Sequence, residues 1–168
     1  MTTLEPMTNP HPTATLKVIA PRDFAGRPRS LAQAVQAAVR TVDEVTLRPV
    51  TRRDAGLAFQ PKALLALLSY CYARQIYASA EVEAVVRRDV HFRQLCHNEI
   101  PDERVIRSFR RHNRDVIQFC LMTALCFVAE EKVRQGIVTK VNKAGFAEEA
   151  KSRIIMAIFL DSAALDGG

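Results

Sequence analysis

The sequence predicts an all-α protein, a helical bundle that contains a helix-turn-helix-like motif. Three observations carry this prediction. Apolar residues recur at three- and four-residue spacing along most of the chain, as they do on the buried face of a helix. N-capping residues and a proline stand where several of these patterns begin. No stretch keeps up the alternation of apolar and polar residues that is typical of a half-buried strand.

The first part of the chain reads as a tail followed by two helices. Residues 1–29 hold five of the eight prolines and little periodic pattern, so we expect a flexible, proline-rich tail. Ser30 is expected to cap the first helix. Pro61 then opens a leucine-rich helix, which is apolar around much of its circumference and should lie at the centre of the core.

The middle of the chain predicts three further helical segments. Ser79 is expected to cap a helix, and a short helix should follow around Phe92. Pro101 disfavours continuation of that helix, and Asp102 is a good N-cap for the next one. From Asp102 the helical pattern runs past Gln118. This succession of helix, short helix, turn and helix resembles a helix-turn-helix motif, in which the last helix enters the major groove of DNA.

The C-terminal part predicts an extension to the helical domain. We assign the domain to residues 30–136 and the extension to residues 137–168, with an amphipathic helix at about 146–164. This helix carries more apolar surface than one contact requires, which favours a homodimer formed through it. Asp161 and Asp166 are interpreted as solvated acids or acids near the helix end.

Composition and charge indicate the kind of partner. The formal net charge is +6 and the isoelectric point about 9.5, which favours acidic partners, nucleic acid first. The four cysteines form no C-x-x-C pair, so we expect reduced thiols and neither a zinc site nor another cofactor. No export signal and no apolar run long enough to cross a bilayer is visible, so we expect a cytoplasmic protein that does not enter a membrane.

Arginines gather in the segment IPDERVIRSFRRHNRDVIQF, residues 100–119. On a continuous helix, four of them would fall within about 80° of arc opposite the apolar side, with Arg110 at the edge. Guanidinium groups suit phosphate and the edge of guanine, because their planar fork donates two parallel hydrogen bonds. Residues 87–114 carry eight arginines against four acids. The predicted DNA-binding residues are Arg87, Arg88, Arg104, Arg107, Ser108, Arg110, Arg111 and Arg114.

Five short motifs follow one another in residues 58–112. They are Phe59-x-Pro61, Tyr70-x-Tyr72, Ser79-x-x-Val82-Glu83, Arg87-x-Asp89-x-x-Phe92-Arg93-x-Leu95, and Pro101-Asp102 followed by Ile106-x-x-Phe109-Arg110. In order and spacing this segment resembles the N-terminal domain of bacterial insertion-sequence transposases of the InsH type. The resemblance implies a helical domain that binds the terminal inverted repeats of the element.

The resemblance also implies what should follow that domain. In those transposases an RNase H-like domain comes next, with three carboxylates that hold two metal ions. This chain has no acid from Gly136 to Phe146, where the first catalytic aspartate is expected, and too few residues remain for the domain. Leu165-Asp166-Gly167 only superficially resembles the missing motif. We therefore expect no catalytic activity of its own.

Two classes of function stay open. The first is a sequence-specific protein that binds duplex DNA, either a domesticated regulator or the DNA-binding half of a split transposase whose catalytic subunit is a separate chain. The second is a helical protein-protein interaction module whose basic face binds an acidic partner.

Overall fold

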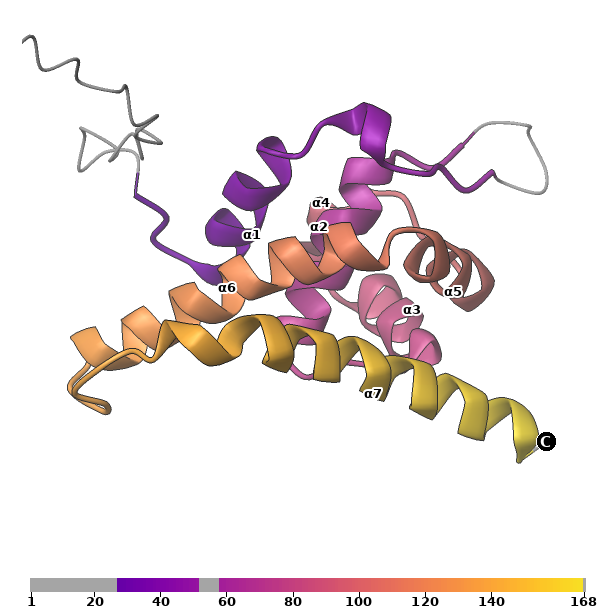
Figure 1. Cartoon of the computed structure of the whole chain (residues 1–168). Coiled ribbons are helices and arrows are strands. Elements are labelled where there is room, and N and C mark those ends of the chain that lie inside the picture. The colour runs from indigo at the N-terminus through magenta and orange to yellow at the C-terminus, as the bar shows by residue number, and fades with distance from the viewer. Residues whose placement is uncertain (1–26, 52–57, 168) are drawn as a thin grey trace, which may run out of the picture.

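This computed structural model describes residues 27–51 and 58–167. Within them the chain forms seven α-helices and two short 3-10 helices (Figure 1). The helices are α1 (Leu31–Arg40), α2 (Pro61–Ala73), α3 (Ser79–Arg88), α4 (Val90–Leu95), α5 (Glu103–His112), α6 (Arg114–Arg134) and α7 (Phe146–Asp166). The described residues contain no strand, only one isolated bridge between Thr51 and Ala58. The predicted all-α class is confirmed. The predicted tail lies outside the described residues up to residue 26.

Local sequence signals fix most of the helix ends. The Ser30 side chain accepts a hydrogen bond from the Gln33 amide at the start of α1, and the Asp102 side chain accepts one from the Val105 amide at the start of α5. Pro61 occupies the first turn of α2, where its missing N–H costs nothing. Gly136 follows α6 with φ of 73°, a left-handed conformation that glycine adopts without strain. The predicted roles of Ser30, Pro61 and Asp102 are confirmed.

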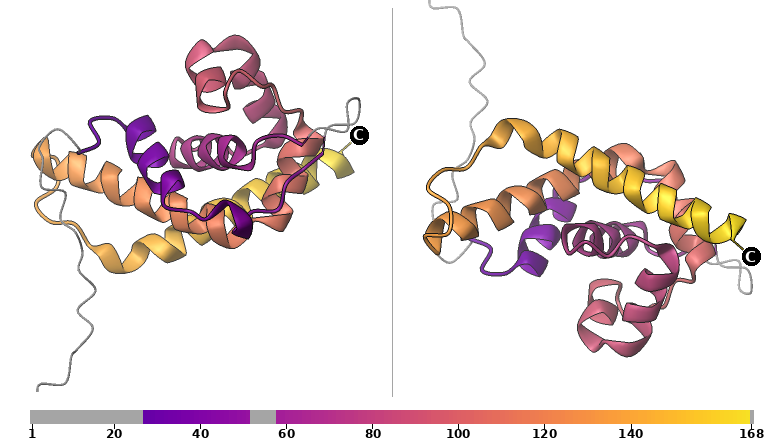
Figure 2. Two further views of the ribbon diagram at one scale, coloured as in Figure 1. Left: turned by 90° about the horizontal axis from the view of Figure 1, so that it is seen from above. Right: turned by 90° about the horizontal axis from the view of Figure 1, so that it is seen from below.

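The hydrophobic core is built around α2. Nine of its thirteen residues are buried, and α1 and α6 pack against it and against each other (Figure 2). Helix α7 runs beside α6 and contributes Ala150, Ile154 and Ala157 to the same core. Most of the extension predicted for residues 137–168 is therefore a helix that completes the core of residues 30–136.

The long arginine helix predicted from Asp102 onward is two helices, which corrects the sequence interpretation. Helix α5 ends at His112 and α6 begins at Arg114. The side-chain amide of Asn113 donates to the carbonyls of Arg48 and Phe109, and its oxygen accepts a hydrogen bond from the Arg48 amide at 2.8 Å. This tertiary contact holds the bend, so Arg114 belongs to a different helix from the other arginines.

Two further expectations concern the state of the cysteines and a membrane-spanning helix. All four cysteines are free thiols, and Cys71, Cys96 and Cys120 are buried. Burial raises the pKa of Cys96 to about 11 and that of Cys120 to about 12, so both are protonated at neutral pH. Among the described residues, no helix combines the length and apolar character needed to span a membrane.

Candidate nucleic-acid interface

Helices α3, α4 and α5 follow one another with short connections, and α3 packs against both of the others. The turn between α4 and α5 contains His97 and Asn98, which both have positive φ, at 53° and 61°. The amide of Asn98 donates to the carbonyl of Arg93 and so closes the end of α4. The succession expected from the sequence is present, with α5 as its last helix.

Two acids hold the start of α5, its own N-cap and one residue of α3. Asp102 caps the helix, and a carboxylate oxygen of Glu83 on α3 accepts a hydrogen bond from the Glu103 amide at 3.1 Å. Negative charge here also complements the positive end of the helix dipole. On the inner side, Val105, Ile106 and Phe109 are buried. Together these contacts fix which side of α5 faces outward.

The outward side of α5 is basic. We call Arg104, Arg107, Ser108 and Arg111 the basic face; at about 100° per residue they span about 100° of arc. Arg111 is exposed and the other three are half-buried. Arg107 lies 3.6 Å from the Glu103 carboxylate, a loose ion pair, while Arg111 forms none with another described residue. The basic face is therefore fixed in place but largely unneutralised.

The remaining predicted arginines lie around this face. Arg114 is exposed at the start of α6. Arg87 and Arg88 are exposed at the end of α3, and Arg87 pairs with Glu83 at 2.9 Å. Because Glu83 also binds the start of α5, Arg87 lies near that end of the basic face. Arg88 follows Arg87 as the last residue of α3.

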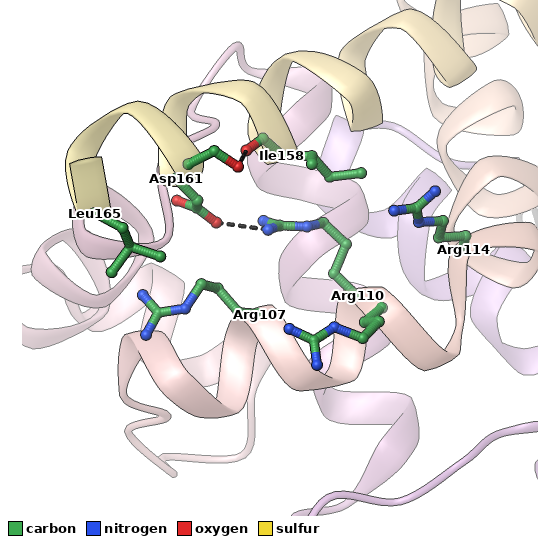
Figure 3. Close-up of a pocket in the computed structure, with 8 residues that line it drawn as sticks. Arg107, Arg110, Arg114, Ile158, Asp161 and Leu165 are labelled. Atoms are coloured by element: carbon green, nitrogen blue, oxygen red, sulfur yellow. Dashed lines mark hydrogen bonds and ion pairs between the residues drawn. The ribbon is translucent and has the colours of Figure 1, made fainter.

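Arg110 is not part of the basic face, which corrects the prediction for this residue. Its exposed fraction is 4%, and its guanidinium reaches α7 (Figure 3). One nitrogen donates to an Asp161 carboxylate oxygen at 2.6 Å, and the other lies 3.3 Å from both the Tyr72 and Ser79 hydroxyls. A guanidinium with these buried partners is held against α7 and does not point outward with the basic face.

The same contacts correct the predictions for Asp161 and Ser79. Asp161 is 7% exposed rather than solvated, and it accepts hydrogen bonds from the amide and the hydroxyl of Ser79 as well as from Arg110. Ser79 is the first residue of α3 and makes no capping bond. Burial disfavours the charged form of Arg110, but contacts with Tyr72 and Asp161 outweigh it and raise the arginine pKa. The pair is a buried salt bridge with further hydrogen bonds to Tyr72 and Ser79.

A pocket of about 150 Å³ lies between α5 and α7, beside this salt bridge. Arg107, Arg111 and Arg114 line it together with the Arg110–Asp161 pair, and Ile158, Ser162 and Leu165 of α7 form the opposite side (Figure 3). Although Arg114 belongs to α6, it therefore lies at the same pocket as Arg107 and Arg111 of α5. Nothing in residues 100–119 predicts that α7 forms one side of this pocket. An acid on an otherwise apolar helix side, such as Asp161, could have indicated that α7 packs near an arginine.

The segment that holds α1 to α5 matches a known protein family. Residues 30–112 match the family described as Transposase domain (DUF772), so the segment from α1 to α5 is related to a transposase domain. No curated protein and no solved structure matches the chain. Within the described residues, no three His, Cys, Asp or Glu side chains lie together as a metal ion would require.

Proposed function

We propose that the protein binds duplex DNA in a sequence-specific way through the basic face of α5 and has no catalytic centre of its own. One observation carries the proposal: the segment that matches a transposase domain ends with α5, whose basic face points outward and is fixed by Asp102 and Glu83. Packing requires only the inner side of this helix. The exposed Arg111 and the half-buried Arg104 and Arg107 on the outer side are the residues that we assign to phosphates and bases.

The position of each side chain assigns it a role. Arg104 and Ser108 lie on the part of the face furthest from the pocket, and Arg104 is in the first turn of α5, where recognition helices usually contact bases. Arg107, Arg111 and Arg114 line the pocket and are assigned to the DNA backbone. Arg87 and Arg88 add positive charge at the side of α3.

Binding should depend strongly on salt. If about five phosphates are neutralised, the logarithm of the association constant should fall with the logarithm of salt concentration with a slope of about −4 to −5. A gel-shift assay against random and genomic duplexes at several salt concentrations measures this slope. Absence of any shift at low salt would refute DNA binding and favour the acidic-protein partner.

Arg104 and Arg114 should differ in what they contribute. Arg104→Ala should weaken binding to a specific site by about 1–3 kcal/mol and relax its sequence preference, because a base contact is lost. Arg114→Ala should weaken specific and random duplexes by the same factor, because a phosphate contact carries no sequence information. Competition assays with both duplex types on both variants measure the difference. If both substitutions change the two duplex types equally, the assignment of roles is wrong.

The absence of catalysis is supported by what the C-terminal acids do. Asp161 is used in the buried pair with Arg110, and Asp166 is exposed at the end of α7. The chain would act as a regulator or together with a separate catalytic subunit. A metal-dependent nuclease domain encoded in a neighbouring reading frame, and its co-purification with this protein, would identify the split transposase.

Helix α7 also supports the homodimer. Its outward side exposes Ile155, Met156 and Phe159, which are 55%, 45% and 65% exposed. A contiguous apolar surface of this kind is typical of contact sites, and one helix face can pair with its own copy about a two-fold axis. Two basic faces could then meet successive half-sites on DNA.

The homodimer predicts a position-dependent effect of one charge. Ile155→Lys should convert a dimer into a monomer, measured by light scattering at matched protein concentrations. Ile137→Lys is the matched control, because Ile137 is 67% exposed but lies after α6 rather than on α7. A monomeric unsubstituted protein, or equal masses for both variants, would rule out this interface.

A further inference from the structure

We propose that the pocket between α5 and α7 binds a backbone phosphate of duplex DNA, so that α7 forms part of the DNA interface. This inference rests on the proposed function and adds a site to it. Helix α7 lies outside the segment that matches a transposase domain, which ends at residue 112. The inference therefore assigns a ligand-contacting role to a part of the chain for which the match implies none.

The charges around the pocket favour an anion. Four arginines and one aspartate line it, which gives a net charge of +3. Arg110 and Asp161 neutralise each other at 2.6 Å, so the excess belongs to Arg107, Arg111 and Arg114. Neither Arg111 nor Arg114 has an acidic partner in the described part of the chain. Arg107 has only its loose pair with Glu103 at 3.6 Å, so the charges of Arg111 and Arg114 in particular favour an anion between them.

The shape and the polar groups fit a phosphate in particular. Guanidinium groups bind phosphate oxygens through paired hydrogen bonds, and two helices supply them here from different directions. Ser162 of α7 also lines the pocket, where its hydroxyl donates to the carbonyl of Ile158 at 2.9 Å. Arg114 is the first residue of α6 and brings its guanidinium to the pocket from that helix. A pocket of about 150 Å³ leaves room for a phosphate group but not for a base pair.

The buried salt bridge makes the pocket depend on α7. Asp161 ties α7 to Arg110 of α5 and to Ser79 of α3, and Arg153 donates to the carbonyls of Tyr72 and Ala73 at the end of α2. These contacts hold Ser162 and Ile158 opposite the arginines. The phosphate site therefore exists only when α7 is docked.

Two matched pairs of variants test the site by the salt slope and affinity for one duplex. Arg114→Gln should lower the affinity and reduce the magnitude of the slope by about 1, the loss of one phosphate contact. Arg134→Gln removes the same charge about 30 Å further along α6, and its slope should be unchanged. Ser162→Asp adds an acid to the α7 wall and should weaken binding. Asn142→Asp adds the same charge at an exposed position before α7 and should not.

The outcomes separate this inference from the proposed function. If the unsubstituted protein binds DNA with a steep slope and Arg114→Gln and Ser162→Asp behave like their controls, DNA binding stands and the phosphate site is overturned. If duplex DNA is not bound at all, both fail. Free inorganic phosphate is the other ligand that the pocket could take. If phosphate stabilises the protein more than chloride does at equal ionic strength, and Arg114→Gln does not change DNA binding, the pocket is a site for free phosphate. That result would also overturn the inference.

Discussion

Replacing Asp161 by alanine is expected to lower the free energy of unfolding by about 3–5 kcal/mol. The substitution leaves the Arg110 guanidinium buried without its counter-ion and removes the acceptor for the amide and hydroxyl of Ser79. Breaking one side of a buried ion pair costs this much because the other charge has lost its solvent and its partner. Urea unfolding followed by circular dichroism measures the change.

Two comparisons make this prediction specific. Asp166→Ala removes an exposed acid from the end of the same helix and should change the free energy of unfolding by less than about 0.5 kcal/mol. Replacing the whole pair, with Arg110→Met and Asp161→Leu together, should cost less than Asp161→Ala alone, since neither charge is then left buried. If Asp161→Ala is no more destabilising than Asp166→Ala, the buried pair is not the contact that holds α7.

Removing α7 altogether should have a larger effect. A chain that ends at Gly145 loses the burial of Ile154, worth about 1.5–3 kcal/mol, in addition to the salt bridge. It also loses the two hydrogen bonds from Arg153 to the end of α2. The removal of α7 also exposes the core that this helix covers beside α6. A loss of several kcal/mol is comparable to the whole stability of a small domain, so the truncated chain should not unfold cooperatively.

A second truncation serves as the control for the first. A chain that ends at Ala164 keeps Asp161 and, among the described residues, removes only the exposed residues 165–167. It should unfold in a cooperative transition like the full chain. Calorimetry on both truncations decides between two roles for α7. Cooperative unfolding of the chain that ends at Gly145 would mean that α7 is an appendage on an independent domain, contrary to the packing described above.

Much of the fold could be predicted because its determinants are local. Ser30, Pro61 and Asp102 mark helix starts through their own backbone chemistry. The leucine-rich pattern of α2 indicates a helix buried on most sides, and nine of its residues are buried. These signals need no knowledge of the rest of the chain.

The features that could not be predicted depend on residues far apart in the sequence. The bend at Asn113 is held by Arg48, 65 residues away, while the residues around it continue a helical pattern without glycine or proline. Arg110 and Asp161 are 51 residues apart, and Arg110 differs from its neighbours only by its place at the edge of the arginine stripe. Because side chains on a stripe edge can turn inward, only the position of α7 decides which arginine is buried.

The measurement that tests DNA binding by the basic face most directly compares two triple variants with the same net charge. In the first, Arg104, Arg107 and Arg111 are replaced by glutamine; in the second, the exposed residues Arg40, Lys132 and Lys151 are replaced. Fluorescence anisotropy with one duplex at fixed salt gives the affinity of each, after circular dichroism shows that both are folded. We expect the first to bind more than about a hundredfold more weakly, since three contacts of about 1 kcal/mol or more are lost, and the second to bind nearly as well as the unsubstituted protein. Equal weakening of both would show that binding follows net charge alone and would contradict a specific role of α5.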